Sequence, residues 1–251
     1  MKKVGVICVL AVFATAISAF DEEDVKDLTL DGVCIQCDLN GVDLRFNNFQ
    51  VRDLRGSSLV GANLDKVNLT GANLTGANLT GANLTGANLT GANLTGVSMV
   101  GAGLMWADLT GANMNKANLA GANLAFSLLT ETNLSQAVLV GANLEGAALL
   151  RATVVEANLS YANLFEANLK HINLTDSILT MANLSSTDLE GANLTRTDLT
   201  KANFSSSKLI KANLSYSRMV EANLVESKLA GTIFCKTTLP KGYEDNQGCR
   251  H

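Results

Sequence analysis

The residues best suited to catalysis are few and lie far apart in the sequence. Cys34 and Cys37 form a C-x-x-C motif, which is redox active in thioredoxin-like proteins, but no βαβ pattern surrounds it here. Neither His171 nor His251 belongs to a set of cysteine, serine or carboxylate residues at the spacing of a catalytic triad or a zinc site. We therefore expect no catalytic residue, no metal and no cofactor, and a protein that is not an enzyme.

The first 19 residues have the features of a secretory signal peptide. Lys2 and Lys3 precede an apolar run from Val4 to about Ile17, and cleavage is expected after Ala19. This run is too short to span a bilayer, and no later stretch approaches the roughly 20 apolar residues that a transmembrane helix needs. The sequence predicts an exported protein, periplasmic or secreted, whose mature chain does not insert into a membrane.

The composition of the mature chain indicates a folded protein that does not bind nucleic acid. Removal of Lys2 and Lys3 leaves 17 basic against 23 acidic residues, a net charge of −6. The whole chain is 47% hydrophobic and 17% charged, which is enough apolar material for a core. Aromatic residues make up only 5%, so leucine and small residues must supply the interior.

A five-residue repeat runs through most of the chain. Every fifth residue from Leu39 to Leu239 is large and apolar, and most are leucine. Two residues before each of these centres lies a small residue, usually alanine, with few exceptions such as Arg52 and Ile172. The register never slips over these 201 positions, so the repeat itself should specify the fold.

A period of five residues fits neither an amphipathic helix nor a flat strand. Five helical steps of about 100° would scatter successive leucines around the axis. In a strand, successive centres would fall on opposite faces. All centres can point inward only if the chain turns in every repeat, and the glycines of "NLTGA" lie where such a turn needs unusual dihedral angles.

The repeat A-N-L-T-G, regular from Ala62 to Thr95 and looser over residues 37–239, closely resembles the pentapeptide-repeat family. The resemblance implies an all-β fold in one domain, a right-handed quadrilateral β-helix of about ten coils with about 20 residues each. At a strand spacing of about 4.8 Å this rod would be on the order of 50 Å long. We expect residues 20–36 to cap its N-terminal end and residues 240–251 to form a C-terminal tail or cap.

Four cysteines remain after export, and they lie in two pairs at the two ends of the expected rod. Bridged Cα atoms must lie within about 7 Å of each other, which excludes bridges between the ends. We therefore predict disulfides Cys34–Cys37 and Cys235–Cys249.

On a four-sided coil, residues 20 apart form columns along the rod, and asparagine dominates two outward columns. The simplest interpretation is structural, because stacked amides hydrogen-bond along the axis. A second interpretation is a flat polar surface that binds ice or a polysaccharide. The columns consist of Asn63, Asn83, Asn123, Asn143, Asn163, Asn183, Asn203 and Asn223, and of Asn73, Asn93, Asn113, Asn133, Asn173, Asn193 and Asn213.

The family resemblance also suggests a DNA-mimic inhibitor of a topoisomerase-type enzyme, because some members act in this way. Two features oppose this alternative. The signal peptide would remove the protein from the cytoplasm, and residues 67–107 contain no charged residue. Duplex DNA over the corresponding length of about 10 Å carries roughly six charges. We favour a structural or protein-interaction scaffold.

One group of apolar residues breaks the polar pattern of the expected surface. Trp106 and Phe126 take corner positions on adjacent coils, with Met105 beside them and Leu128 and Leu150 on the next face. Such residues can simply cover a neighbouring coil, but a contiguous exposed apolar patch commonly marks an interaction site. We predict that this patch binds an unknown protein partner or mediates self-association, with Trp106 as its anchor.

Overall fold

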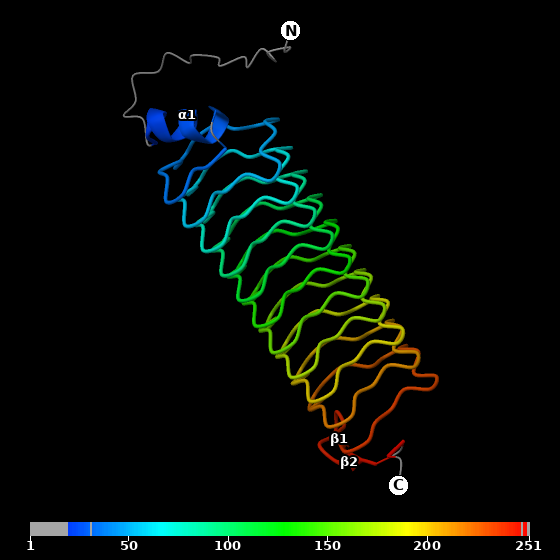
Figure 1. Cartoon of the computed structure of the whole chain (residues 1–251). Coiled ribbons are helices and arrows are strands. Elements are labelled where there is room, and N and C mark those ends of the chain that lie inside the picture. Colours follow the sequence, from blue (N-terminus) through cyan, green and yellow to red (C-terminus); the bar gives the residue numbers. More distant parts are fainter. Residues whose placement is uncertain (1–19, 31, 247, 250–251) are drawn as a thin grey trace.

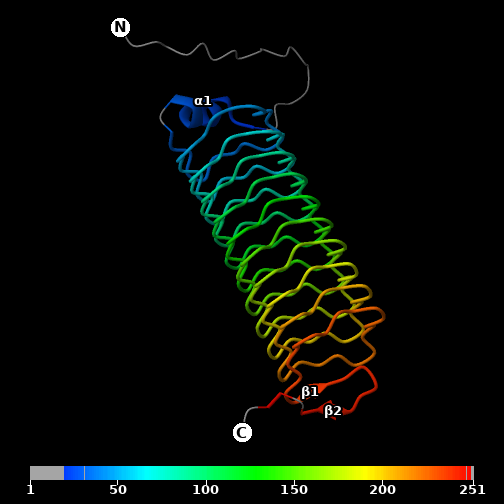
Figure 2. The same ribbon diagram turned by 90° about the vertical axis from the view of Figure 1, so that its right-hand side faces the viewer.

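A computed structural model describes residues 20–30, 32–246 and 248–249 of the chain. The expected signal peptide, residues 1–19, lies outside this range. The described chain is a rod of stacked coils with one helix at its N-terminal end and a short hairpin at its C-terminal end (Figures 1 and 2). Among the described residues, no helix has the length and apolar character needed to cross a membrane.

The coils form a right-handed, four-sided β-helix, as the resemblance to the pentapeptide-repeat family implies. Parallel β-bridges join residues one coil, or 20 positions, apart, from Val33 with Asp53 to Arg218 with Thr238. One repeat supplies one side of the coil. The fold is therefore all-β in its organisation, although each side contributes only a single bridged residue rather than a long strand.

Each position of the repeat has a distinct place in the backbone hydrogen bonding. In one repeat, the amides of Leu69 and Gly71 donate to carbonyls of the next coil at 2.7 and 2.9 Å, while the amide of Asn68 donates to the previous coil at 2.9 Å. The Ala72 amide closes the corner on the Leu69 carbonyl at 3.0 Å. The Thr70 amide donates to the Asn68 side chain at 3.1 Å. Every amide of the repeat is thus satisfied.

The corners explain the glycines. Every fifth residue from Gln36 to Lys236 has a positive φ, between 52° and 71°. Together with the hydrogen bond that closes each corner, this is the geometry of a type II turn, whose third residue must be left-handed. Glycine adopts this conformation without strain, whereas other L-residues do so at a cost of roughly 1–2 kcal/mol.

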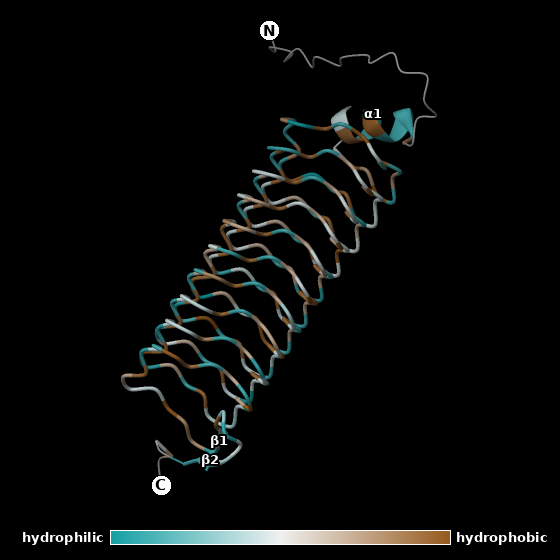
Figure 3. Ribbon diagram, turned by 180° about the vertical axis from the view of Figure 1, so that it is seen from behind, coloured by the Kyte–Doolittle hydropathy of each residue, from teal (hydrophilic) through white to brown (hydrophobic). Residues whose placement is uncertain are grey.

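The core is a stack of leucines and alanines along the rod axis. Leu144 is fully buried between Leu124 and Leu164 of the neighbouring coils, and Ala142 beside it is fully buried as well. Hydrophilic and hydrophobic residues alternate along each coil in Figure 3, as inward and outward positions follow one another. The repeat periodicity therefore places the core correctly.

The N-terminal end is closed by helix α1, Glu22–Leu30. Leu28 of this helix is fully buried, and Val25 packs against the core. The coil itself begins at Val33, inside the segment that the sequence assigned to the cap. Cys34 is an inward centre and Cys37 an inward small position, so their disulfide, with Cα atoms 5.4 Å apart, forms part of the first core layer.

The C-terminal end is covered by a hairpin of β1, Thr237–Thr238, and β2, Glu244–Asp245. The Cys235–Cys249 disulfide, with Cα atoms 4.7 Å apart, joins the tail to the last coil. Both disulfides are those expected from the sequence. The segment from residue 240 thus leaves the repeat and folds back over part of the open end.

Candidate interaction surfaces

The asparagine columns form hydrogen-bonded ladders along the rod. From Asn143 to Asn223, each amide nitrogen of one column donates to the amide oxygen one coil earlier, at 2.9 to 3.3 Å. The same oxygens accept the backbone amide two residues later, for example that of Ser185 at 3.2 Å. The ladder therefore links neighbouring coils and completes each turn.

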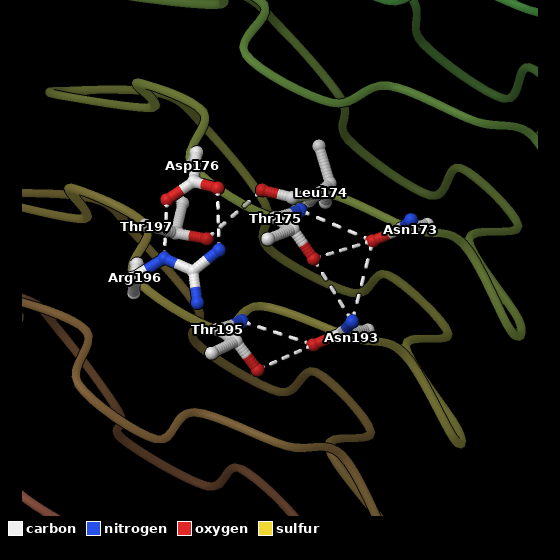
Figure 4. A network of polar contacts seen from close by, with 8 residues as sticks. All are labelled: Asn173, Leu174, Thr175, Asp176, Asn193, Thr195, Arg196 and Thr197. Carbon is white, nitrogen blue, oxygen red and sulfur yellow. Dashed lines mark hydrogen bonds and ion pairs between the residues drawn. The ribbon is translucent and has the colours of Figure 1, made fainter.

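The second column shows how fully its polar groups are engaged (Figure 4). Thr175 and Thr195 each donate their hydroxyl to the asparagine of their own repeat at 2.6 Å, and Asn193 donates to Asn173 at 3.3 Å. In these two coils the threonine hydroxyls and the Asn193 amide are directed at protein atoms rather than at solvent. This geometry favours the structural interpretation of the asparagine columns.

An ion pair between coils borders this face. Arg196 donates to Asp176 one coil earlier, with its second contact at 2.6 Å (Figure 4). These hydrogen bonds hold the pKa of the Asp176 carboxyl below its ordinary value. Arg196 is exposed and Asp176 is partly exposed, so the pair fixes a corner rather than forming a reactive site.

Replacement of Asn183 tests the contribution of the ladder to stability. Asn183→Ala should lower the free energy of unfolding by about 1–2 kcal/mol more than Asn88→Ala. Both asparagines accept from the residue two positions later, but only Asn183 also bonds to asparagines of the coils above and below. Urea unfolding of the two variants measures the difference, and equal losses would show that the ladder adds nothing.

The apolar residues singled out from the sequence occupy one corner and the face beside it. Trp106 and Phe126 are exposed over 61% and 48% of their surface, and Leu128 over 47%. Met105 and Leu150 are half-buried. Trp106 and Phe126 lie on successive coils of the same corner, because the Trp106 amide bonds to the carbonyl of Ala125. The structure thus places the five residues in one region of the surface.

The corner residues on this side of the rod form a single line, which we call the aromatic edge. The side chains of Lys66 and Phe126 lean toward the next coil. A Cβ on Gly146 would lie 2.6 Å from the Phe126 ring, and one on Gly86 would lie 3.2 Å from Lys66. The ring of Phe126 therefore rests on bare backbone. The edge consists of Phe46, Lys66, Gly86, Trp106, Phe126, Gly146 and Glu166.

Other exposed apolar residues were missed by the sequence analysis. Tyr161 and Met181 share another corner, with exposures of 62% and 46%, and Ile178 is 42% exposed on the adjoining face. At the C-terminal end, Leu224 and Leu229 line a groove of about 350 Å³. Tabulating corners by their position in the 20-residue coil would have found the first group, whereas the groove depends on how the tail folds.

The polar residues with possible chemistry form no reactive site in the described chain. His171 is an exposed corner residue whose ring lies over Gly191. Asp24, Cys34 and Cys37 lie close enough together to resemble metal ligands, but both thiols are consumed by their disulfide.

The family model for pentapeptide repeats matches eight copies, over residues 53–86, 87–124, 117–153, 157–196 and 177–215. This is more than half of the chain. The chain belongs to the pentapeptide-repeat family. A search of curated protein sequences finds no match.

Several solved structures of pentapeptide-repeat proteins are similar to this chain. HetL, involved in heterocyst differentiation regulation in the cyanobacterium Nostoc sp. strain PCC 7120, is 29% identical, with a TM-score of 0.32 and 82% of this chain and 90% of HetL covered. QnrB1, a plasmid-mediated fluoroquinolone resistance protein, is 14% identical, with a TM-score of 0.40 and coverage of 76% and 92%. Rfr23 from Cyanothece 51142 is 21% identical, with a TM-score of 0.20 and coverage of 86% and 93%.

Proposed function

We propose that this pentapeptide-repeat protein is a non-catalytic scaffold that acts outside the cytoplasm and binds a protein through its aromatic edge. The observation that carries the proposal is the exposure of Trp106 and Phe126 on adjacent coils, at 61% and 48%. Aromatic side chains of this size are the usual anchors of protein interfaces. The expected signal peptide supports the location.

The backbone at this edge adds a second argument. Trp106 and Phe126 hold φ values of 58° and 59°, in a conformation that Gly101 and Gly121 adopt at the neighbouring corner of the same coils. Bulky residues there cost backbone strain and expose apolar surface without filling the core. Because many other corners also lack glycine, the strain alone is not specific. The combination of strain, size and exposure favours a binding role.

The two rival functions find less support in the surface. Residues 67–107 are uncharged, so the rod offers no continuous line of charges that could imitate DNA. On the asparagine faces, hydroxyls such as those of Thr175 and Thr195 donate to protein atoms, which favours a structural role over binding of ice or a polysaccharide. A protein partner that buries an apolar edge fits these observations better.

The paired change Trp106→Gly with Phe126→Gly tests this function without damaging the fold, because glycine is the unstrained residue at a corner. We expect thermal stability to be unchanged or higher and binding at the edge to be lost. The matched control is Tyr161→Gly with Met181→Gly, which removes two exposed apolar corners elsewhere.

The fluorescence of Trp106, the only tryptophan, gives a direct measurement. In dilute mature protein the emission should be that of a solvent-exposed indole, and it should shift to shorter wavelength on association. A blue-shifted emission in the dilute monomer, or association that survives the paired glycine change, would contradict the proposal.

A further inference from the structure

Six successive corners of the aromatic edge, from Lys66 to Glu166, have a symmetric order of residue types. Its corners from coil to coil read Lys66, Gly86, Trp106, Phe126, Gly146 and Glu166, each 20 residues after the last. An aromatic pair lies at the centre, a glycine lies on either side of it, and charges of opposite sign lie at equal distances beyond. If the rod is rotated by 180° so that its two ends exchange places, Glu166 takes the position that Lys66 had.

The two charged corners are available for a partner. Both Lys66 and Glu166 are exposed, and neither forms an ion pair within the described part of the chain. The Lys66 ammonium lies 5.6 Å from the centre of the Phe46 ring, which orients the side chain but leaves its charge unneutralised. Asp65 precedes Lys66 in the sequence without forming an ion pair with it, and residues 67–107 carry no charge.

We propose that the partner of the aromatic edge is a second copy of this chain, docked antiparallel about a two-fold axis midway between Trp106 and Phe126. This inference rests on the proposed function, and names the partner of the same site. The axis brings Lys66 of each copy opposite Glu166 of the other, and Trp106 opposite Phe126. A two-fold interface repeats each contact twice, so both charge pairs form.

The glycines of the edge fit the same arrangement. The Phe126 ring lies over Gly146, and the axis places this level opposite Gly86 of the second copy. Gly86 adds no side chain of its own at that corner, so the ring meets the Gly86 backbone and the stem of Lys66, which lies 3.2 Å from where a Gly86 Cβ would be. A parallel arrangement would instead set Lys66 against Lys66 and Glu166 against Glu166, which is electrostatically unfavourable.

Two columns of residues flank the aromatic edge, one position before and two positions after each corner. Both are compatible with this docking. In the antiparallel register each acidic residue of these columns faces an uncharged one, so no like charges meet. The facing positions are Asp65 with Phe165, Thr85 with Glu145, Met105 with Ala125, Asn68 with Asn168, Asn88 with Ala148 and Asp108 with Leu128.

Charge reversal of the mature full chain tests the orientation, with sedimentation velocity as the measurement. Lys66→Glu and Glu166→Lys should each weaken self-association about 10-fold or more at low salt, because each creates two like-charge contacts. An equimolar mixture of the two variants should associate again, since both contacts become attractive. The double variant should recover as well. Lys116→Glu, the same change on the opposite edge, should have no effect.

The outcomes separate this inference from the proposed function. Association that depends on Trp106 and Phe126 but not on the charge reversals would overturn the antiparallel docking and leave the binding edge intact. A wild-type chain that stays monomeric at about 100 μM, where an interface of useful strength would be populated, would also overturn it. Self-association that survives Trp106→Gly with Phe126→Gly would overturn both.

Discussion

Replacing Leu144 by alanine is expected to lower the free energy of unfolding by about 2–5 kcal/mol, the range for a buried leucine whose site cannot collapse. Leu144 is fully buried in the middle of the rod, between Leu124 and Leu164. Its amide also donates to the next coil at 2.6 Å, which fixes the position of its Cα. The backbone ladder therefore prevents the coil from contracting around the missing side chain, and a cavity remains.

Leu229→Ala is the matched control at the end of the rod. Leu229 occupies the same position in its repeat but lies in the last coil, where it is 37% exposed. The same change there should cost less than half as much, because part of the side chain already contacts solvent. Urea unfolding of both variants at equal protein concentration gives the comparison. Equal losses would mean that the end coil is covered by something other than its own tail.

This contrast follows from the linear organisation of the repeat. Each coil contacts only its neighbours, so the stability of the rod is a sum of coil and interface contributions. A defect in a central coil weakens two interfaces, whereas a defect in a terminal coil weakens one. The linear stacking also explains why the chain needs α1 at one end and the hairpin at the other, since both terminal core layers would otherwise be open to solvent.

The sequence predicts the fold of this protein unusually well because one short pattern determines it. The spacing of five and the small residue two before each centre are sufficient to place Leu144 and Ala142 inside. The glycines of "NLTGA" identify the corners, and the asparagines that precede the centres form the expected columns. Even the disulfides follow from the rod, because only cysteines at the same end can meet.

The candidate site is predicted less completely, and the reasons are local. The sequence identifies Trp106 and Phe126 as corner residues, but not that the Phe126 ring turns onto the bare backbone of Gly146. It gives no sign that the coil begins at Val33, because Cys34 does not resemble a leucine centre. It also leaves Tyr161 and Met181 unnoticed, since single substitutions at corners are common and only their stacking makes a patch.

Loss of the Cys235–Cys249 disulfide is expected to produce the second large effect. The bridge spans a sequence separation of 14 residues, and closing a loop of this size is worth about 3 kcal/mol. The hairpin that it supports has only two bridged pairs, Thr237 with Asp245 and Thr238 with Glu244. So short a hairpin is marginal by itself, and Cys249→Ser should release the tail.

Release of the tail should uncover the last core layer rather than unfold the rod. The tail lines the groove beside Leu224, Leu229 and Phe234, through Leu239, Pro240, Lys241, Tyr243 and Asp245. In Cys249→Ser we expect fast amide hydrogen exchange over residues 235–249 and unchanged protection around Leu144. Cys37→Ser is the control, because its bridge spans only three positions and α1 still covers it. Slow exchange of the tail in Cys249→Ser would show that the hairpin and its apolar contacts hold the end closed without the disulfide.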